Sequence, residues 1–252
     1  MPLQKTIGIS LRKRHYSNTS QVVTFLTPHH GKVSVLAKGS KRPRTPFGGP
    51  FDVAVLYDIV FADRRSGLQI LTEATLLDSF GPARRTYRSM ARTSAILELL
   101  LASSQPGQSS PELFNLAVDA LRAITADGFQ EALLPGFEAK LLDVLGVFPE
   151  LQRCALCGAH PVGRQFSLSL SNGGLACPSC RASAGLVVPV SPDVLSLLAR
   201  LQTLPLNKTG RLRIPHNRIR ELGRLLSQMV SYALEMEIRS FTLSQPGVVS
   251  AK

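Results

Sequence analysis

The sequence predicts an α+β protein of several modules: a small β-barrel, followed by an all-helical domain into which a four-cysteine metal module is inserted. Three observations predict this fold. Short runs of alternating apolar and polar residues fill the first eighty residues, the apolar period changes from two toward 3.6 after Gly81-Pro82, and the only four cysteines lie close together in the second half of the chain. The expected modules are residues 1–80 (barrel), 81–150 (first helical part), 151–187 (cysteine module) and 188–252 (second helical part).

Five strands are expected in the first module, a number that suits a small barrel. The expected strands are Ile7–Leu11, Gln21–Leu26, Val33–Ala37, Val53–Phe61 and Gln69–Asp78. A long connection from Lys38 to Pro50 separates the third strand from the fourth, with positive charge near its start and glycine and proline near its end.

Helices are expected on both sides of the cysteine module, because serine and proline mark several starts and glycine marks one stop. The expected helices are Pro82 to about Ala102, Ser110 to about Thr125, a third that ends near Leu145, a fourth that opens at Ser191-Pro192, and a last one from about Asn217 to Met236.

The cysteines form two Cys-x-x-Cys pairs, Cys154 with Cys157 and Cys177 with Cys180, separated by nineteen residues. A tight turn can aim both thiolates of a pair at one metal ion, and a hairpin can bring the two turns together. Phe166 to Leu170 suits the first strand of that hairpin, with a two-residue turn at Asn172-Gly173. We expect a tetrahedral Zn²⁺ site, which is structural because four thiolates leave no open position for water.

Two disulfides, four free thiols or a redox Cys-x-x-Cys motif are the alternatives to zinc. Disulfides suit short secreted chains, whereas the segment that starts at Met1 lacks the apolar run of a secretory signal. The expected location is therefore a reducing cytoplasm. No apolar run is long enough to span a membrane.

The formal net charge of +12 points to a polyanionic partner. The excess lies at both ends: residues 1–80 carry 11 basic and 5 acidic side chains, residues 81–150 carry 6 and 8, and residues 151–252 carry 12 and 4. Nucleic acid, an anionic membrane surface or a merely solvated cationic surface would each fit this distribution.

The candidate nucleic-acid contacts are cations in turns and loops of the barrel and on the first helix. Loops at barrel rims hold nucleic acid by pairing cations with phosphates and stacking aromatic rings on bases. The candidates are Arg12, Lys13, Arg14, Lys38, Lys41, Arg42, Arg44, Arg64, Arg65, Arg84, Arg85, Arg88 and Arg92. Arg84, Arg88 and Arg92 are expected to share one helix face because of their four-residue spacing. Solvated loops and an ordinary solvated helix face are the alternatives.

Aromatic side chains near these cations could stack on bases or fill the barrel core. They are Tyr16, Phe47, Phe51, Tyr57 and Phe61. A further basic group, which contains Arg211, Arg213, Arg218, Arg220 and Arg224, could bind DNA or receive an acidic peptide.

Motifs of enzyme chemistry are absent from the sequence: it has no phosphate-binding Gly-x-x-x-x-Gly-Lys-Ser/Thr loop, no His-Glu-x-x-His and no Gly-x-Ser-x-Gly. No catalytic residues are therefore proposed, and we expect a binding protein rather than an enzyme.

Several motifs, taken in order along the chain, are similar to those of the RecO family of bacterial recombination mediators and DNA-annealing proteins. They are His30-Gly31-Lys32, Ala37-Lys38-Gly39, Leu97-Glu98-Leu99-Leu100, Leu145-Gly146-Val147-Phe148-Pro149, Cys154-Ala155-Leu156-Cys157-Gly158 and Gly173-Gly174-Leu175-Ala176-Cys177-Pro178-Ser179-Cys180. The resemblance covers essentially the whole chain. The segment Phe47-Gly48-Gly49-Pro50-Phe51 departs from the Leu-Gln-Pro-Phe often found in relatives.

The resemblance implies an amino-terminal OB-fold, a helical carboxy-terminal region with an inserted zinc module, and no catalytic centre. It also implies binding to single- and double-stranded DNA and annealing of strands covered by single-stranded-DNA-binding protein. With RecR, such a protein would help to load RecA, so RecA is an indirect partner, and the setting would be the nucleoid within the cytoplasm. A zinc-containing module that binds RNA or the ribosome is the competing interpretation.

Overall fold

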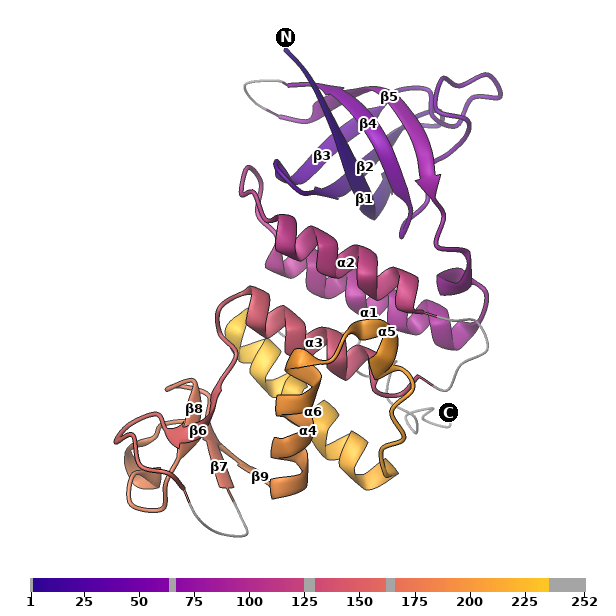
Figure 1. Ribbon diagram of the computed structural model, residues 1–252. Helices are drawn as coiled ribbons and strands as arrows, with labels where there is room; N and C mark the ends of the chain where they lie inside the picture. The colour runs from indigo at the N-terminus through magenta and orange to yellow at the C-terminus, as the bar shows by residue number, and fades with distance from the viewer. Residues whose placement is uncertain (1, 64–66, 125–129, 162–165, 236–252) are drawn as a thin grey trace, which may run out of the picture. The chain divides into compact units, whose positions relative to one another are not determined.

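The computed structural model describes residues 2–63, 67–124, 130–161 and 166–235 (Figure 1). The chain divides into two compact units, residues 1–127 and 128–252. Unit 1 contains the first five strands and the first two helices, and unit 2 contains the remaining helices and a small sheet. The four-module division expected from the sequence stays a proposal beside this two-unit division.

Five strands of unit 1 close into a barrel in the order β1-β2-β3-β5-β4. They are β1 (Leu3–His15), β2 (Gln21–Thr27), β3 (Gly31–Ala37), β4 (Leu56–Ala62) and β5 (Gln69–Asp78). The β3–β5 pair is parallel, and the other pairs are antiparallel. β1 pairs with β4 along its first half and with β2 along its second, and a bulge between Ser10 and Arg12 lets it bend from one partner to the other. The unit is thus β-rich and OB-like.

The fourth strand is shorter than the expected Val53–Phe61, because the chain turns before it. The Asp52 carboxylate accepts the N–H of Val53 at 2.9 Å, and Ala54 has a φ of 53°. A left-handed residue cannot continue a strand ladder, so β4 begins only at Leu56.

The barrel core is built from apolar residues of the strands and of the β3–β4 connection. Phe51 of this connection is buried and packs against Phe25 and Tyr57, with ring centroids 6.1 and 5.1 Å away. The side chain of Gln21 holds it there, because its oxygen accepts the Phe51 N–H at 2.9 Å and its amide donates to the Phe51 carbonyl at 3.2 Å. The end of the long connection is therefore fixed to the barrel.

Helices α1 (Tyr87–Ser103) and α2 (Pro111–Ala123) belong to the same unit, and the loop between them meets the β2–β3 turn. The Lys32 N–H donates to the Gln105 carbonyl and the Gly107 N–H donates to the His30 carbonyl, both at 3.0 Å. The Lys32 ammonium also donates to the Leu101 carbonyl at 2.9 Å. A cation at the carboxyl end of α1 is favourable because helix carbonyls there carry partial negative charge.

The expected single helix from Pro82 is wrong, because Thr86 interrupts it. Thr86 is extended, its hydroxyl accepts the Ser89 N–H at 3.1 Å, and the Ser89 hydroxyl accepts the Thr86 N–H at 3.1 Å. This capping box starts α1 at Tyr87, and a separate short helix, η1 (Gly81–Arg84), precedes it.

Unit 2 contains helices α3 (Leu133–Val144), α4 (Pro192–Thr203), α5 (Leu206–Thr209) and α6 (His216–Ala233). α3, α4 and α6 pack on one another through buried leucine, isoleucine and valine side chains. Gly146 follows α3 with a φ of 72°, as expected for a helix stop.

A four-stranded sheet in the order β6-β8-β7-β9 is inserted between α3 and α4. Its strands are β6 (Glu150–Cys154), β7 (Phe166–Ser169), β8 (Gly174–Ala176) and β9 (Val187–Val190), with the short helix η2 (Arg181–Ser183) between β8 and β9. The β7–β8 hairpin confirms the expected one, but its turn has four residues. The Ser169 hydroxyl accepts the N–H of Asn172 at 3.1 Å and its side-chain amide at 2.9 Å, which closes the longer turn.

Within the described ranges, none of the helices combines the length and the apolar character that a membrane crossing requires.

A substitution at Gly31 would test the contact between the barrel and the α1–α2 loop. The φ of Gly31 is +61°, and a Cβ there would lie 2.5 Å from the Gln108 carbonyl oxygen and closer still to that of Gln105. Gly31→Ala should lower the free energy of unfolding by about 3 kcal/mol, because left-handed strain adds to overpacking. Gly48→Ala is the control, since Gly48 has a φ of +71° but open space around the new methyl group, and it should cost only about 1 kcal/mol. Equal losses in urea unfolding would contradict this account.

Candidate metal centre and nucleic-acid interface

The four cysteines are positioned by the small sheet of unit 2. Cys154 ends β6, and Cys177 directly follows β8, its parallel neighbour. Cys157 lies in the turn after β6, and Cys180 immediately precedes η2. The sheet therefore brings two segments together that are twenty residues apart in the sequence.

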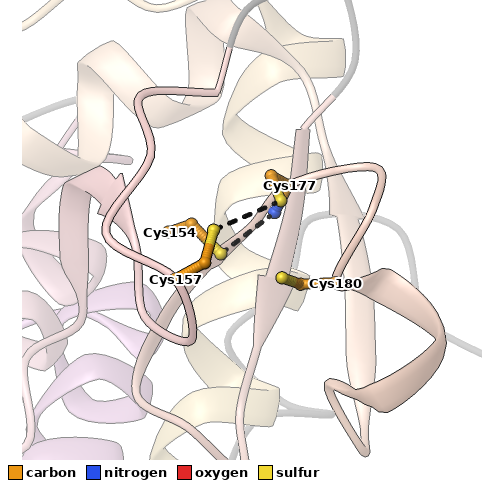
Figure 2. Close-up of side chains that lie close together, drawn as sticks. All are labelled: Cys154, Cys157, Cys177 and Cys180. Atoms are coloured by element: carbon orange, nitrogen blue, oxygen red, sulfur yellow. Dashed lines mark hydrogen bonds between the residues drawn. The ribbon is translucent and has the colours of Figure 1, made fainter.

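Each Cys-x-x-Cys pair forms a tight backbone turn. The N–H of Gly158 donates to the Cys154 carbonyl at 2.9 Å, and the N–H of Cys180 donates to the Cys177 carbonyl at 3.0 Å. The turns bring the side chains of both pairs close together (Figure 2).

All four sulfur atoms lie within 4.8 Å of one another, and Cys157 Sγ is 3.7 Å from Cys177 Sγ. Sulfurs around a tetrahedral metal with bonds of ~2.3 Å are separated by ~3.8 Å, whereas a disulfide bond measures ~2.05 Å. All four cysteines are free of disulfides. The residues thus fit a single four-coordinate metal ion.

The pKa values of the four thiols also favour a bound cation. The backbone N–H groups of Cys177, Cys157 and Leu156 hydrogen bond to Cys154 Sγ and lower its pKa to about 6. Hydrogen bonds with the sulfurs of Cys177 and Cys157 raise the pKa of Cys180 to about 12. The first thiolate therefore forms easily and the last with difficulty, and a divalent cation would offset the repulsion among four thiolates.

The apolar core of this small sheet is limited. Leu168, Leu175, Ala176 and Val190 of its strands are buried, as are Cys154 and Cys177. So few apolar side chains bury too little surface to hold a sheet of short strands. A bound metal would supply the missing stabilisation.

A basic surface lies at one rim of the barrel, where the β1–β2 turn meets the β3–β4 connection. Lys41 joins them: its backbone N–H donates to the Thr19 carbonyl at 3.0 Å and its ammonium donates to the Ser17 carbonyl at 3.1 Å. The same ammonium lies 2.6 Å from Nδ1 of His15. Two basic segments that are separate in the sequence therefore form one surface.

We call this surface the basic rim. Its cations are Arg12, Arg14, Lys38, Lys41, Arg42 and Arg44. All are exposed except Lys41, which is half-buried, and no carboxylate in the described part of the chain pairs with them. Tyr16 lies on the same turn with 61% of its surface exposed.

The other candidate aromatics do not offer a free ring. Phe51, Tyr57 and Phe61 are buried in the barrel core, and Phe47 packs against it. Tyr16 is thus the one candidate among the five that could stack on a base.

Two family models match this chain: Recombination protein O N terminal over residues 1–80 and Recombination protein O C terminal over residues 84–241. A relative from Rhodopirellula baltica is 34% identical over 202 residues, which cover 79% of this chain and 75% of the relative. Relatives from Bacillus pumilus and Bacillus subtilis are 29% and 26% identical over 227 residues, covering 89% of this chain and 86% and 87% of their own lengths. All three are named DNA repair protein RecO.

The chain belongs to the RecO family. This membership places it among proteins of DNA repair and recombination, which are mediators and not catalytic enzymes.

Two of the candidate DNA contacts in this RecO-family chain form ion pairs with Asp52. Lys13 Nζ and Arg84 Nη1 lie 2.8 and 2.9 Å from its two carboxylate oxygens. Arg84 also donates to the Ser79 carbonyl at 3.0 Å. Partial burial raises the pKa of Asp52, but hydrogen bonds from Lys13 and the Val53 N–H and the two positive charges together lower it below its usual value. Asp52, which the sequence interpretation passed over, joins the barrel to η1.

The remaining candidates lie in different surroundings. Arg85 and Arg88 are exposed, whereas Arg92 is only 8% exposed. Because Arg84 is on η1 and Arg92 is buried, the expectation that Arg84, Arg88 and Arg92 share one solvent-facing helix face is wrong. Arg64 and Arg65 fall outside the described residues. The assignment of these side chains to DNA binding stays a prediction.

The chain purified without chelator should contain one metal ion with four sulfur ligands. Cys180→Ser should lower the metal content several-fold because it removes one of four thiolates, whereas Ser179→Ala, a change of the exposed neighbour, should leave it unchanged. Metal analysis and X-ray absorption at the metal edge measure stoichiometry and ligands. A metal-free wild-type protein would contradict the assignment.

Proposed function

We propose that this chain is a recombination mediator that binds single- and double-stranded DNA at the basic rim and anneals complementary strands. The observation that supports this most directly is the joining of two basic loops by Lys41 into one exposed surface without carboxylate partners in the described residues. Such a surface suits phosphates, because cations already neutralised by carboxylates would release few counterions on binding. Membership of the RecO family supports a role of this binding in DNA repair.

Tyr16 adds a contact with bases to the contact with phosphates. Its ring is exposed on the β1–β2 turn, which Lys41 holds in place through the carbonyl groups of Ser17 and Thr19. Stacking of a base on an aromatic ring contributes about 1–3 kcal/mol and tolerates every base. The rim would thus hold a single strand without preference for sequence, as an OB-fold does.

The metal ion of the cysteine cluster is proposed to be Zn²⁺ in a structural role. Four thiolates select zinc among common cellular divalent ions of fixed oxidation state, and they close its coordination shell. When bound, the ion would contribute about 10 kcal/mol or more to folding of the module. In the described part of the module, Arg153 and Arg181 lie near the cysteines, so the large basic clusters are elsewhere.

Annealing by this chain would need no nucleotide, because pairing of complementary bases is downhill. The barrier is the repulsion between two phosphate backbones, and a cationic protein lowers it. The proposed partners are RecR, single-stranded-DNA-binding protein and, indirectly, RecA, in the cytoplasm at the nucleoid. These follow from the resemblance to the RecO family.

The basic rim predicts a definite salt dependence of binding. With six cations engaged on single-stranded DNA, log K should fall with log salt with a slope of ~4. The rim variant, Lys38→Gln with Arg42→Gln and Arg44→Gln, should lower this slope by ~2 and weaken binding about tenfold or more. Lys41 is kept because it joins the loops.

A control variant removes three exposed arginines of unit 2 instead, by Arg153→Gln, Arg181→Gln and Arg200→Gln. It loses the same net charge as the rim variant, so a difference between the two variants reports where the charges lie rather than how many there are. Fluorescence anisotropy of a labelled oligonucleotide across a salt series measures the affinity and the salt slope of each variant. Equal effects of the two variants would remove the rim from the proposed site.

Annealing of complementary DNA coated with single-stranded-DNA-binding protein, with and without RecR, tests the function itself. The wild-type chain should accelerate annealing, and RecR should allow RecA to assemble on the coated strand. RNA strands of the same sequence separate this function from an RNA-binding one. Binding to RNA with no DNA annealing would replace the proposal by the RNA- or ribosome-binding alternative.

A further inference from the structure

Unit 2 carries a second concentration of positive charge, between Lys208 and Arg224. These seventeen residues hold six lysine and arginine side chains and one carboxylate, Glu221. Five of the six cations are exposed: Lys208, Arg211, Arg213, Arg220 and Arg224. We call these five residues the α6 surface.

The single carboxylate of this segment is already used within unit 2. Arg218, the sixth cation, lies 2.8 Å from Asp193 of α4 and 3.2 Å from Glu221. Glu221 also accepts the Ser191 N–H at 3.1 Å, and these contacts hold α6 against the start of α4. In the described residues, no carboxylate forms an ion pair with the five cations of the α6 surface.

The helix turns two of these cations outward. Ile219, Leu222 and Leu226 of α6 are buried in the helical core. Arg220 and Arg224 are four residues apart, and one turn of 3.6 residues places them on the same side, away from that apolar face. Packing of α6 thus fixes a pair of guanidinium groups in solvent.

The α6 surface differs from the basic rim because it has no exposed Phe, Tyr or large aliphatic side chain. The imidazole of His216 is exposed within this segment, but its Nε2 lies 3.6 Å from the Glu131 carboxylate. From Pro205 to Arg224, none of the described side chains belongs to the exposed large hydrophobic residues of the protein. Tyr232 is the next exposed ring, eight residues beyond Arg224 on the helix, which is about 12 Å. The surface can therefore contact phosphates, and the one exposed ring in this described segment, the His216 imidazole, is already next to a carboxylate.

We propose that the α6 surface binds the sugar-phosphate backbone of a second DNA strand and leaves its bases free to pair. This inference rests on the proposed annealing function and names the place of the second strand. The rim, with Tyr16, holds one strand by phosphates and bases, and the α6 surface holds the other by phosphates alone. An acidic peptide is the other anion that arginines attract, but protein interfaces are centred on buried aromatic or apolar anchors, which this surface lacks.

The test uses two non-complementary oligonucleotides, one with a donor dye and one with an acceptor, and the full chain. Energy transfer reports a complex of one protein with both strands, and light scattering gives its mass. The α6 variant, Arg213→Gln with Arg220→Gln and Arg224→Gln, retains Arg218 and its contacts. The control variant at Arg153, Arg181 and Arg200 removes the same charge from the same unit.

The wild-type chain and the control variant should bind both strands. The α6 variant should bind the first strand within about twofold of wild type, yet lose about tenfold or more in two-strand complexes and in the annealing rate of uncoated complementary strands. Circular dichroism and one metal ion per chain would show that unit 2 is folded.

Three outcomes would overturn the inference alone, while wild-type annealing still supports the proposed function. The first is an equal loss of two-strand complexes in the α6 and control variants, and the second is an unchanged amount of these complexes in the α6 variant. The third is an α6 variant that loses only its binding to a short poly-aspartate peptide, measured in parallel as the acidic-peptide alternative. A wild-type chain that anneals strands but never holds two at once would also overturn the inference alone. A wild-type chain that anneals no complementary strands would overturn both proposals.

Discussion

A shortage of carboxylates governs how this chain arranges its charge. There are 17 acidic side chains for 29 basic ones, and several of the acidic side chains form ion pairs that connect neighbouring elements of the fold. Asp52 joins β1 to η1 through Lys13 and Arg84, Asp78 joins β5 to α2 through Arg122, and Asp193 with Glu221 joins α4 to α6 through Arg218. Exposed pairs of this kind contribute little stability individually, but each removes a cation from the set that can meet phosphates. Many of the exposed cations that have no carboxylate partner in the described residues lie at the basic rim and on the α6 surface.

The four sulfurs bear on the stability of the small sheet, whose strands are very short. Strands of three to five residues with only four buried apolar side chains besides Cys154 exclude too little water to be stable on their own. A metal held by both ends of the hairpin would replace that missing core, and Gly158 and Gly173, with φ of 74° and 62°, allow the tight turns. The cluster lies apart from the main basic segments of the sequence, so a structural role accounts for it better than nucleic-acid readout.

The sequence was sufficient for features that depend on local pattern. Alternation of apolar and polar residues predicted the strands of the barrel, and the two Cys-x-x-Cys pairs predicted the sulfur cluster. Each strand pattern and each cysteine pair is contained within a few consecutive residues. Features that depend on long-range contacts were missed: β6 and β9 exist only because they pair with the hairpin, and β4 starts late because Asp52 turns the chain. Arg84, Arg88 and Arg92 do not share one helix face, because the Thr86 cap starts α1 at Tyr87 and leaves Arg84 on η1, and Arg92 is buried. The union of two basic loops by Lys41 also has no signature in the sequence.

A difference in chemistry between the two basic surfaces bears on how annealing could proceed. A protein that stacked the bases of both strands would have to release them before they paired, at a cost of about 1–3 kcal/mol for each stacked base. Phosphate contact alone carries no such cost, because the Watson–Crick edges stay in solvent while the cations reduce backbone repulsion. One surface with an exposed tyrosine and one without would therefore combine firm retention of the first strand with an unhindered second strand. This combination would suit sequence-independent annealing, since any base could be held and any complement accepted.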